Sequence, residues 1–457
     1  MSGLRYVAMT GCLGTGFLEG SLENATSVKT SFIGCDAGST DGGPHQLGVE
    51  APLYGDDSIK RDLRLGIRRA RGLRVPLLVG SANGGGTDNG VDNVARIVRE
   101  VAKEENLNFR MARLYTEVDR ELMIDRYRQG RVHALIGAPE ITEKTFTDSA
   151  HIVGMTGGEP WLAALDQGAD VVIAGRASDA SIYAAIPERE GYPRGLVWHA
   201  AKISECGSAA VADPRGPDSL TCTLEEDHFV VEPGNPELHC TPHSVALHNL
   251  YETANPFQLR EAPGTTDTTD ATFEALDDRR VKVSGSKFVE EMYTIKLEGA
   301  EFVGYRSIVM AAVRDPVVLR QLDTWIEGVK VDTAEHIERT LGHQEYQLRI
   351  RTYGSNGTLG PIESRPFEGH ESFLIIDAVA SSQDLATTVA LITNQILSHH
   401  RLRSGWRQGI STYVAYPFSP MVTERGPVYR FSLHHAVEVE DPMELFRIET
   451  EEVGASA

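Results

Sequence analysis

Short apolar segments recur through the first half of the chain, and a loop rich in glycine or charged side chains follows each of them. Such segments are typical of buried parallel strands, and the stretches between them repeat apolar residues with the helical period. Alternating strands and helices predict a Rossmann-like parallel sheet with helices on both faces. The predicted strands are Arg5–Met9, Ser31–Cys35, Val75–Val79, Phe109–Tyr115, Val132–Ile136 and Asp170–Ala174, and the clearest helices are Ser58–Arg71 and Val91–Glu104.

The second half has a different pattern, which begins near the Pro- and Gly-rich segment Asp213–Ser219. Beyond this segment, strand-like runs outnumber helical ones, as in α+β domains with a mostly antiparallel sheet. A chain of 457 residues is also too long for one ordinary hydrophobic core. We therefore predict an α/β ligand-binding domain over residues 1–215 and an α+β domain over residues 216–457.

The charge balance and the cysteines indicate which partners and which cellular compartment to expect for this protein. Acidic residues number 65 against 44 basic ones, and a net charge of -21 repels phosphate backbones, so we expect no nucleic-acid partner. The five cysteines form no CxxC pair and suit a reducing compartment. No apolar run is long enough to span a membrane, and no secretory signal is evident. We expect a cytoplasmic protein without a membrane partner.

Three glycine-rich loops are candidates for ligand binding. The loop after the second strand contains Gly38, Ser39, Thr40 and Asp41. The loop after the third strand contains Ser81, Gly84 and Gly85 and immediately precedes a helix, whose free N–H groups favour a carboxylate or phosphate. The turn at 10–16 has the spacing G-x-x-G-x-G, which departs from the dinucleotide fingerprint, so it indicates a structural or anion-binding turn more than a nicotinamide site.

The acidic loops give a hypothesis about catalysis. The carboxyl ends of parallel strands share one edge of a sheet, so their loops converge there. Acids crowded in one crevice need a divalent cation such as Mg²⁺, or some of them keep a proton and serve as general acids and bases. For any single acid, capping a helix or pairing with a basic side chain is the simpler alternative. The acids are Asp36, Asp41, Glu117, Asp119, Glu140, Glu159 and Asp179, with Arg176 among them.

Several histidines invite other interpretations. The segment Trp198–Gly207 predicts a helix with His199 and Lys202 on one face, His199 being a proton shuttle or a buried core residue. The spacing of His239, Cys240 and His243 fits no standard zinc ligand set closely. His434 and His435 are adjacent in a predicted strand, where alternation buries only one of them.

Nine ordered segments together resemble the acyclic terpene utilisation (AtuA-like) family. The resemblance runs from about Ile33 to Asp315, with a fainter similarity as far as Glu438. It implies a role in bacterial breakdown of geraniol- and citronellol-type terpenes through branched acyl-CoA intermediates, and association with a small partner subunit or a further domain. It carries over no catalytic residues. The segments are CDAGSTDGGPHQLG, LLVGSANGGG, IGAPEIT, GADVVIAGRASDASIYA, WHAAKISECG, DHFVVEP, CTPHSVALHNLYE, DDRRVKVSGSKF and YTIKLEGAEFVGYRSI.

The leading hypothesis is a catabolic lyase that adds or removes water, or cleaves a C–C bond, in a small branched carboxylate or its CoA thioester. The predicted base is Asp41 or Glu117, with Glu140 as the paired acid. The predicted substrate-binding residues are Gly38, Ser39, Thr40, Ser81, Gly84, Gly85, Arg176, Ser178, Asp179 and Lys202.

Two alternatives stay open, a non-catalytic acyl-CoA-binding or scaffolding subunit and an NAD(P)-dependent oxidoreductase. The cofactor is a divalent cation or none, with CoA as part of the substrate. We expect a homo-oligomer, with a small partner subunit as a further option.

Overall fold

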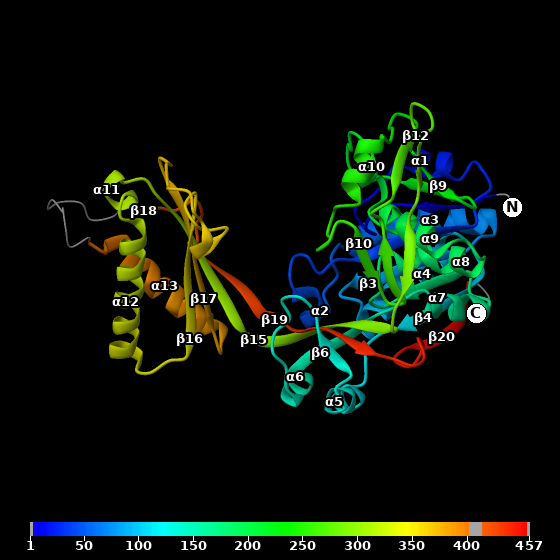
Figure 1. The fold of residues 1–457 in the computed structure, drawn as a ribbon. Helices are drawn as coiled ribbons and strands as arrows, with labels where there is room; N and C mark the ends of the chain where they lie inside the picture. The colour runs from blue at the N-terminus through cyan, green and yellow to red at the C-terminus, as the bar shows by residue number, and fades with distance from the viewer. Residues whose placement is uncertain (1–2, 402–413, 455–457) are drawn as a thin grey trace. The chain divides into compact units, whose positions relative to one another are not determined.

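The computed structural model describes residues 3–401 and 414–454 (Figure 1). Contacts between Cα atoms divide the chain into two compact units. Unit 1 comprises Met1–Glu301 and Phe431–Ala457, and unit 2 comprises Phe302–Arg430. This division differs from the predicted boundary after residue 215, because strands that follow residue 215 join the same sheet as the N-terminal strand.

A ten-stranded sheet forms the centre of unit 1. Its five central strands are mutually parallel, which confirms the predicted α/β class. The strands that flank them on both sides pair in the antiparallel direction. The strand order is β12 (Thr272–Ala275), β13 (Val281–Ser284), β9 (His228–Pro233), β8 (Leu220–Leu224), β1 (Leu4–Ala8), β2 (Phe32–Gly38), β3 (Leu77–Gly84), β7 (Val171–Ala174), β4 (Phe109–Tyr115) and β20 (Arg447–Val453).

Helices cover both faces of this sheet, and the alternation of side chains along β1 explains why. Tyr6 and Ala8 point into a core with α7 (Glu159–Asp166), α8 (Ser181–Arg189) and α9 (Arg194–Ser204). Val7 and Met9 point into the opposite core with α1 (Glu19–Ala25), α3 (Asp56–Leu73) and α4 (Asp88–Glu104).

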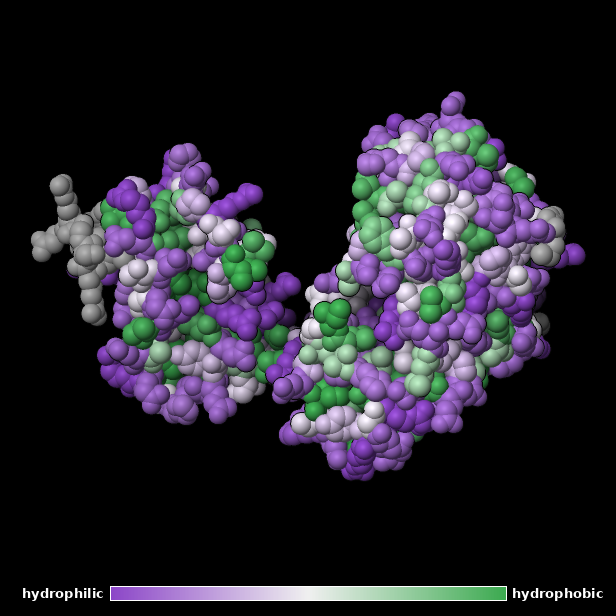
Figure 2. All heavy atoms as spheres, viewed as in Figure 1, coloured by the Kyte–Doolittle hydropathy of each residue, from purple (hydrophilic) through white to green (hydrophobic). Residues whose placement is uncertain are grey.

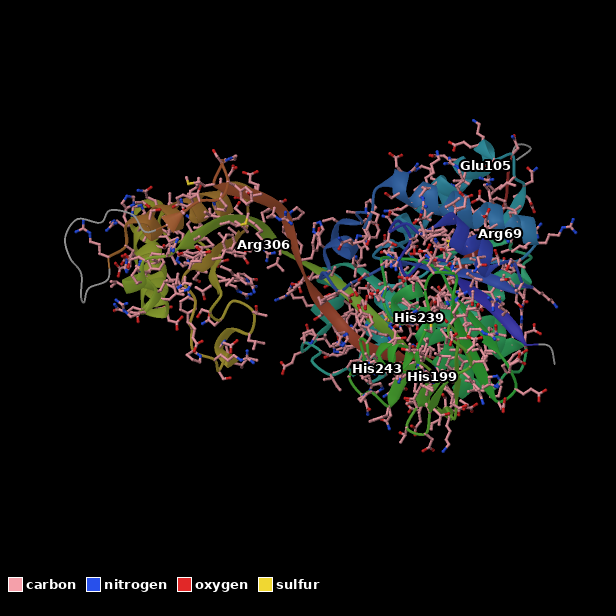
Figure 3. The ribbon with its side chains drawn as sticks, turned by 90° about the horizontal axis from the view of Figure 1, so that it is seen from above. Arg69, Glu105, His199, His239, His243 and Arg306 are labelled. Carbon is pink, nitrogen blue, oxygen red and sulfur yellow. The ribbon has the colours of Figure 1, made fainter. Side chains whose placement is uncertain are left out.

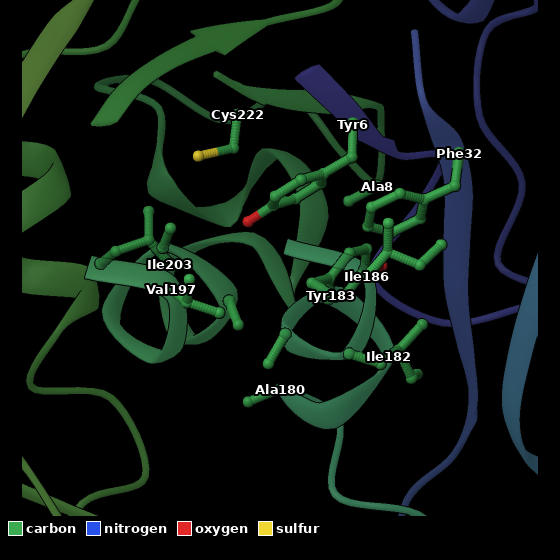
Figure 4. Packing of buried hydrophobic residues seen from close by; sticks show 14 of the residues in the cluster. Tyr6, Ala8, Phe32, Ala180, Ile182, Tyr183, Ile186, Val197, Ile203 and Cys222 are labelled. Atoms are coloured by element: carbon green, nitrogen blue, oxygen red, sulfur yellow. The ribbon is translucent and has the colours of Figure 1, made fainter. Parts of the chain in front are cut away.

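Aromatic stacking is part of the first core. The rings of Tyr6 and Phe32 have centroids 5.0 Å apart, and those of Tyr6 and Tyr183 are 5.5 Å apart (Figure 4). All three side chains are fully buried. Tyr6 therefore packs β1 against Phe32 of the paired strand β2 and against α8.

One predicted parallel strand lies elsewhere. The segment predicted as Val132–Ile136 forms only β5 (Val132–Ala134), which pairs in the antiparallel direction with β19 (Val422–Glu438). Its side chains are at least partly exposed, so it lacks the burial on both faces that a central parallel strand needs. The sequence analysis missed β6 (Ser149–Met155), which pairs with the first part of β15 (Thr294–Val313).

Unit 2 is an antiparallel sheet packed against two helices, in agreement with the predicted α+β character of the second half. The later part of β15 pairs with β17 (Ser372–Ala380), which pairs with β16 (Tyr346–Tyr353). The two long helices are α12 (Leu322–Leu341) and α13 (Gln383–His399), and the short helix α11 (Pro316–Leu319) precedes α12. Trp325 is fully buried in this core.

The remaining elements connect these layers. They are α2 (His45–Val49), α5 (Arg120–Arg128), α6 (Glu143–Asp148), η1 (Gly207–Ala210), α10 (Pro242–His248), η2 (Gly360–Ile362), β18 (Val414–Ala415) and a small sheet of β10 (Gln258–Glu261), β11 (Gly264–Asp267) and β14 (Lys287–Glu290). On the face drawn in Figure 2, hydrophilic residues are spread over both units, with smaller groups of hydrophobic residues between them. Within the described ranges, no helix has the length and apolar character needed to cross a membrane.

Candidate functional site

Arg176 is the centre of a buried polar cluster beyond the carboxyl end of β7. Its Nε donates to Glu298 Oε2 at 3.0 Å, its Nη1 donates to Ser81 Oγ at 3.0 Å, and its Nη2 reaches Thr40 Oγ1 at 3.5 Å. Lys296 Nζ contacts the other Glu298 oxygen at 2.9 Å. The structure therefore brings together Thr40, Ser81 and Arg176, which come from three predicted ligand loops.

The backbone of Arg176 is held by two neighbouring loops. Its N–H donates to Thr116 Oγ1 at 2.6 Å and to the carbonyl oxygen of Gly86 at 3.2 Å. Gly86 has a φ of +72°, and a Cβ at this position would lie 2.3 Å from the Arg176 nitrogen. Only glycine combines this backbone conformation with this close approach.

A second group of acids lies beside this cluster, and the pKa values of these acids are raised. Burial raises the pKa of Glu261 to about 7, although the Ser178 hydroxyl donates to it at 2.6 Å and the nearby Lys202 charge opposes the rise. Burial also raises the pKa of Glu205 to about 8, although Lys202 contacts it directly. Carboxyls that titrate near neutrality suit acid–base chemistry.

Asp179 lies within electrostatic reach of both groups. Burial raises its pKa, whereas the charges of Arg176 and Lys202 lower it. Arg176 Nη1 lies 4.0 Å from Asp179 Oδ1. Burial, followed by the charge of Asp179, also raises the pKa of the neighbouring Asp36 well above its usual range. The predicted residues Arg176, Ser178, Asp179 and Lys202 therefore belong to one electrostatic neighbourhood.

Glu298 is the exception among these acids. Burial raises its pKa, but Arg176 and Lys296 outweigh that effect and lower it to about 2. The side chain is 4% exposed and remains an anion at all physiological pH values. Glu298 therefore orients the two cations and does not exchange protons.

Two cavities open at this cluster, and both have Lys296 in their walls. The smaller one has a volume of about 160 Å³ and is lined by Ser178, Glu261 and Lys296 together with Leu135, Met155 and Ala262. The larger one, of about 550 Å³, is lined by Thr40, Lys296, Glu298 and His434 together with Ile136 and Leu433. Apolar walls with a few convergent polar groups are typical of sites for small organic ligands.

Unit 2 has a larger hollow, of about 990 Å³, at Arg320, Arg365, Glu368 and His370. All four of these residues are exposed. Charges in water interact weakly with one another, so this hollow is the poorer candidate for chemistry.

The three predicted catalytic acids lie in different surroundings. Asp41 is exposed, and its charge contributes to raising the pKa of Glu252, after burial of that carboxyl. Glu117 is half-buried and accepts a hydrogen bond from His151 Nδ1 at 2.7 Å. Glu140 is exposed, although its loop at 136–139 lines the larger cavity. Their predicted catalytic roles stay predictions.

The N–H groups of the glycine loops serve mainly the protein itself. The Gly38 N–H, predicted as a substrate donor, donates to Asp36 Oδ2 at 2.9 Å. A Cβ at Gly38 would lie 2.5 Å from the Gly84 carbonyl, and one at Gly85 would lie 2.8 Å from Leu47, so these glycines allow close packing. Ser39 accepts a hydrogen bond from the Asp41 N–H at 3.2 Å.

At two positions where the sequence predicted the binding of an anion, a carboxylate of the protein itself accepts the backbone hydrogen bonds. In the turn after β1, the N–H groups of Gly14 and Gly16 donate to Asp62 Oδ2 at 2.9 and 3.0 Å. At the N-terminus of α4, the Asp88 N–H donates to Glu117 Oε2 at 2.9 Å. The first turn is therefore structural, which weakens the nicotinamide alternative.

The histidine and cysteine candidates do not converge. His239 and His243 are exposed, whereas Cys240 and His248 are buried (Figure 3 labels His199, His239 and His243). Burial lowers the pKa of His199 to about 3, and its Nδ1 is 2.6 Å from Ser286 Oγ. His199 is thus a neutral core residue. His435 is 2% exposed and His434 is half-buried, as strand alternation predicted.

Sequence reasoning missed Glu205, Glu261, Lys296 and Glu298 as site residues. Lys296 and Glu298 are two residues apart in β15, and side chains at this spacing in a strand lie on the same face. The K-x-E pattern could therefore have indicated that the two side chains lie together. Glu205 lies within the predicted helix Trp198–Gly207, three residues after Lys202. Glu261 offers no local signal, because its burial comes from distant elements.

Comparison with known proteins supports one relationship. Residues 79–190 match the family model described as acyclic terpene utilisation family protein AtuA. No curated protein and no solved structure matches the chain. The matched segment includes Ser81, Gly86, Glu117, Arg176 and Asp179 and lies within the stretch where the sequence resembles this family. The match bears out that resemblance over residues 79–190.

Proposed function

We propose that this protein is a catabolic lyase that adds or removes water, or cleaves a C–C bond, in a small branched carboxylate or its CoA thioester. The matching family is named for the utilisation of acyclic terpenes, which are branched hydrocarbons. The observation that carries the proposal is the mixture of titratable carboxyls and fixed cations around the two cavities that share Lys296.

The reaction needs a group that exchanges a proton with substrate carbon or oxygen. Glu261 suits this task because its pKa of about 7 allows both protonation states at neutral pH, and because it lines the smaller cavity. In this proposal, for dehydration, the ionised carboxylate removes the proton from the carbon next to the substrate carbonyl, and the resulting acid protonates the departing hydroxyl, which leaves as water. For C–C cleavage, the carboxylate removes the proton of the β-hydroxyl, which becomes a carbonyl, and the resulting acid protonates the carbon of the departing enolate.

The cations would stabilise the negative charge that develops on the carbonyl oxygen. Lys296 lines both cavities, and Glu298 holds its ammonium group at 2.9 Å. We keep for Arg176 and Lys202 the predicted role of attracting the substrate carboxylate, since both are buried cations beside this site. Preorganised charges of this kind act strongly where water is excluded.

A ligand screen followed by a turnover assay tests the proposal. Melting of the full chain is first measured with branched acyl-CoAs, hydroxy acids and NAD(P), because a ligand at 100 times its dissociation constant adds about 2.7 kcal/mol of stability. Compounds that raise the melting temperature are then assayed for hydration, dehydration and cleavage. We expect Glu261→Gln to lower kcat by about 10²–10⁴-fold. The matched control is Glu274→Gln, since Glu274 is exposed on β12.

The outcomes separate the alternatives. Full activity of Glu261→Gln contradicts the assignment of the acid–base group. Tight binding of an acyl-CoA with no turnover by the wild-type protein favours the non-catalytic subunit, and stabilisation by NAD(P) alone favours the oxidoreductase. Asp41→Asn, Glu117→Gln and Glu140→Gln, measured in the same assay, test the roles predicted from sequence.

A further inference from the structure

A second group of side chains, Glu50, Glu117 and His151, lies outside the proposed acid–base machinery. The three residues come from distant segments, the C-terminal end of α2, the loop after β4, and β6. One potential ligand atom from each lies within 4.8 Å of the other two. Among the residues that the structure describes, this is the group whose donor atoms converge closely enough to hold a metal ion.

Strand register explains the convergence of Glu117 and His151. Glu117 forms an isolated antiparallel bridge with Val153, and His151 lies two residues before Val153 in β6. Directly paired residues and their diagonal neighbours present side chains on one face. Glu298 pairs with Val153 from the other side, so it lies on this same face.

The geometry around the ring of His151 is that of a metal-binding histidine. Its Nδ1–H donates to Glu117 Oε1 at 2.7 Å, and its Nε2 faces Glu50 Oε2 at 3.8 Å. Binding of a metal ion displaces a proton from its histidine ligand. An ion can therefore take the place of the Nδ1 proton between His151 and Glu117, with a Glu50 oxygen within 4.8 Å as the third ligand. The side chains of His151 and Glu50 are 20% and 25% exposed, so an ion can enter from solvent.

Glu50 supplies an independent indication of a missing ligand. Its Oε1 is buried and accepts no hydrogen bond, whereas its Oε2 accepts one from Asn89 Nδ2 at 3.0 Å. An unsatisfied buried oxygen of this kind costs about 1–3 kcal/mol, and more when it is charged. A cation between Glu50 and His151 would satisfy it.

We propose that Glu50, Glu117 and His151 bind a divalent first-row transition metal ion such as Zn²⁺ or Mn²⁺. Imidazole favours these ions over Mg²⁺ and Ca²⁺, and two carboxylates complete a compact set of hard and borderline donors. Three protein ligands leave at least one coordination position for water or a substrate oxygen. The site is independent of the proposed lyase activity, because ion binding is measurable without turnover.

Metal binding to the full-length protein tests this proposal. Protein stripped with a chelator and dialysed is titrated with Zn²⁺ by calorimetry and with Mn²⁺ by electron paramagnetic resonance. We expect one ion per chain and a higher melting temperature with metal. His151→Ala should abolish the binding, Glu50→Gln should weaken it strongly, and Glu117→Gln should weaken it by about 10–100-fold.

His133→Ala is the matched control. His133 Nε2 contacts Glu438 Oε1 at 2.6 Å, so it is also a histidine paired with a glutamate, but it lies outside the proposed triad. This variant should bind metal like the wild-type protein. Circular dichroism verifies that each variant is folded. If His151→Ala does not fold, Glu50→Gln tests the proposal in its place.

Two results would overturn the proposal. One is that wild-type protein binds neither ion at millimolar concentration. The other is that folded His151→Ala and Glu50→Gln bind with wild-type affinity and stoichiometry. Loss of metal binding without loss of lyase activity leaves the proposed function intact, and the reverse pattern leaves the metal site intact.

Discussion

Removal of the Arg176 side chain should destabilise unit 1 strongly, because it leaves a buried anion with one cation fewer. The side chains of Arg176 and Glu298 are 8% and 4% exposed, with 3.0 Å between Arg176 Nε and Glu298 Oε2. Breaking a buried ion pair by removing one partner costs about 3–5 kcal/mol. The lowering of the Glu298 pKa from 4.5 to about 2 corresponds to about 3 kcal/mol, which lies in that range. Lys296 still contacts Glu298, so we expect Arg176→Ala to cost about 3 kcal/mol.

The same contact should appear in the pH dependence of stability. The folded-state pKa of Glu298 lies below the unfolded-state value, so its contribution is complete above pH 4.5 and is lost as the pH falls towards 2. Urea unfolding followed by circular dichroism measures this contribution as the difference in unfolding free energy between wild type and Glu298→Gln. That difference should be smaller at pH 3 than at pH 6.

A surface pair provides the control for this prediction. Arg189 and Asp166 are also 3.0 Å apart, but their side chains are 39% and 71% exposed. Arg189→Ala should therefore cost no more than about 1 kcal/mol. A cost for Arg176→Ala as small as this, or a Glu298→Gln effect that does not change with pH, would refute the reasoning that the pair is buried and charged.

Three further predictions concern the loops and the proton-exchanging acid. Gly86→Ala should lower the unfolding free energy by at least about 1–2 kcal/mol in thermal denaturation, because φ at Gly86 is +72° and the added Cβ would collide with Arg176. Gly42→Ala is the control and should not lower the unfolding free energy, since no atom lies within 4 Å of a Cβ at that position. Asp62→Asn should lower the unfolding free energy in urea by about 1–3 kcal/mol, since Asp62 accepts two backbone N–H groups in a fully buried position. The folded-state pKa of Glu261, about 7, lies above the usual 4.5, so the wild-type protein should lose stability relative to Glu261→Gln as the pH rises from 4.5 to 7. If the difference in unfolding free energy between the two proteins does not change with pH, the burial of this carboxyl is contradicted.

The sequence predicted the α/β core well because the signals there are local. The predicted strand Phe109–Tyr115 has the observed bounds of β4, and α3 and α4 lie where the helical period places them. Continuous apolar runs indicate strands that are buried on both faces, and such strands need no distant partner to be recognised. The segments β5 and β6 lack this signal, because β5 is short and at least partly exposed and β6 mixes buried with half-buried positions.

The sequence also indicated which loops contribute to the site. Thr40, Ser81, Arg176, Ser178 and Asp179 were predicted from glycine-rich or charged loops at strand ends, and the structure brings them near one another because parallel strands share an edge. Lys202 was predicted from a helix, and its charge also acts on Asp179. Their chemical roles were not readable in this way. Asp41 and Glu140 have the same carboxyl group as Glu261, but both side chains are exposed to water.

The sequence by itself determined the alternation of strands and helices, the parallel core and the resemblance to AtuA-like proteins. Only the tertiary structure decided which acids keep protons and which groups face one another. Glu261 depends on burial beside Ser178, and His151 depends on the register of β6 with the loop after β4. A pKa and a donor set are both set by neighbours that are distant along the chain, and a local pattern carries no information about them.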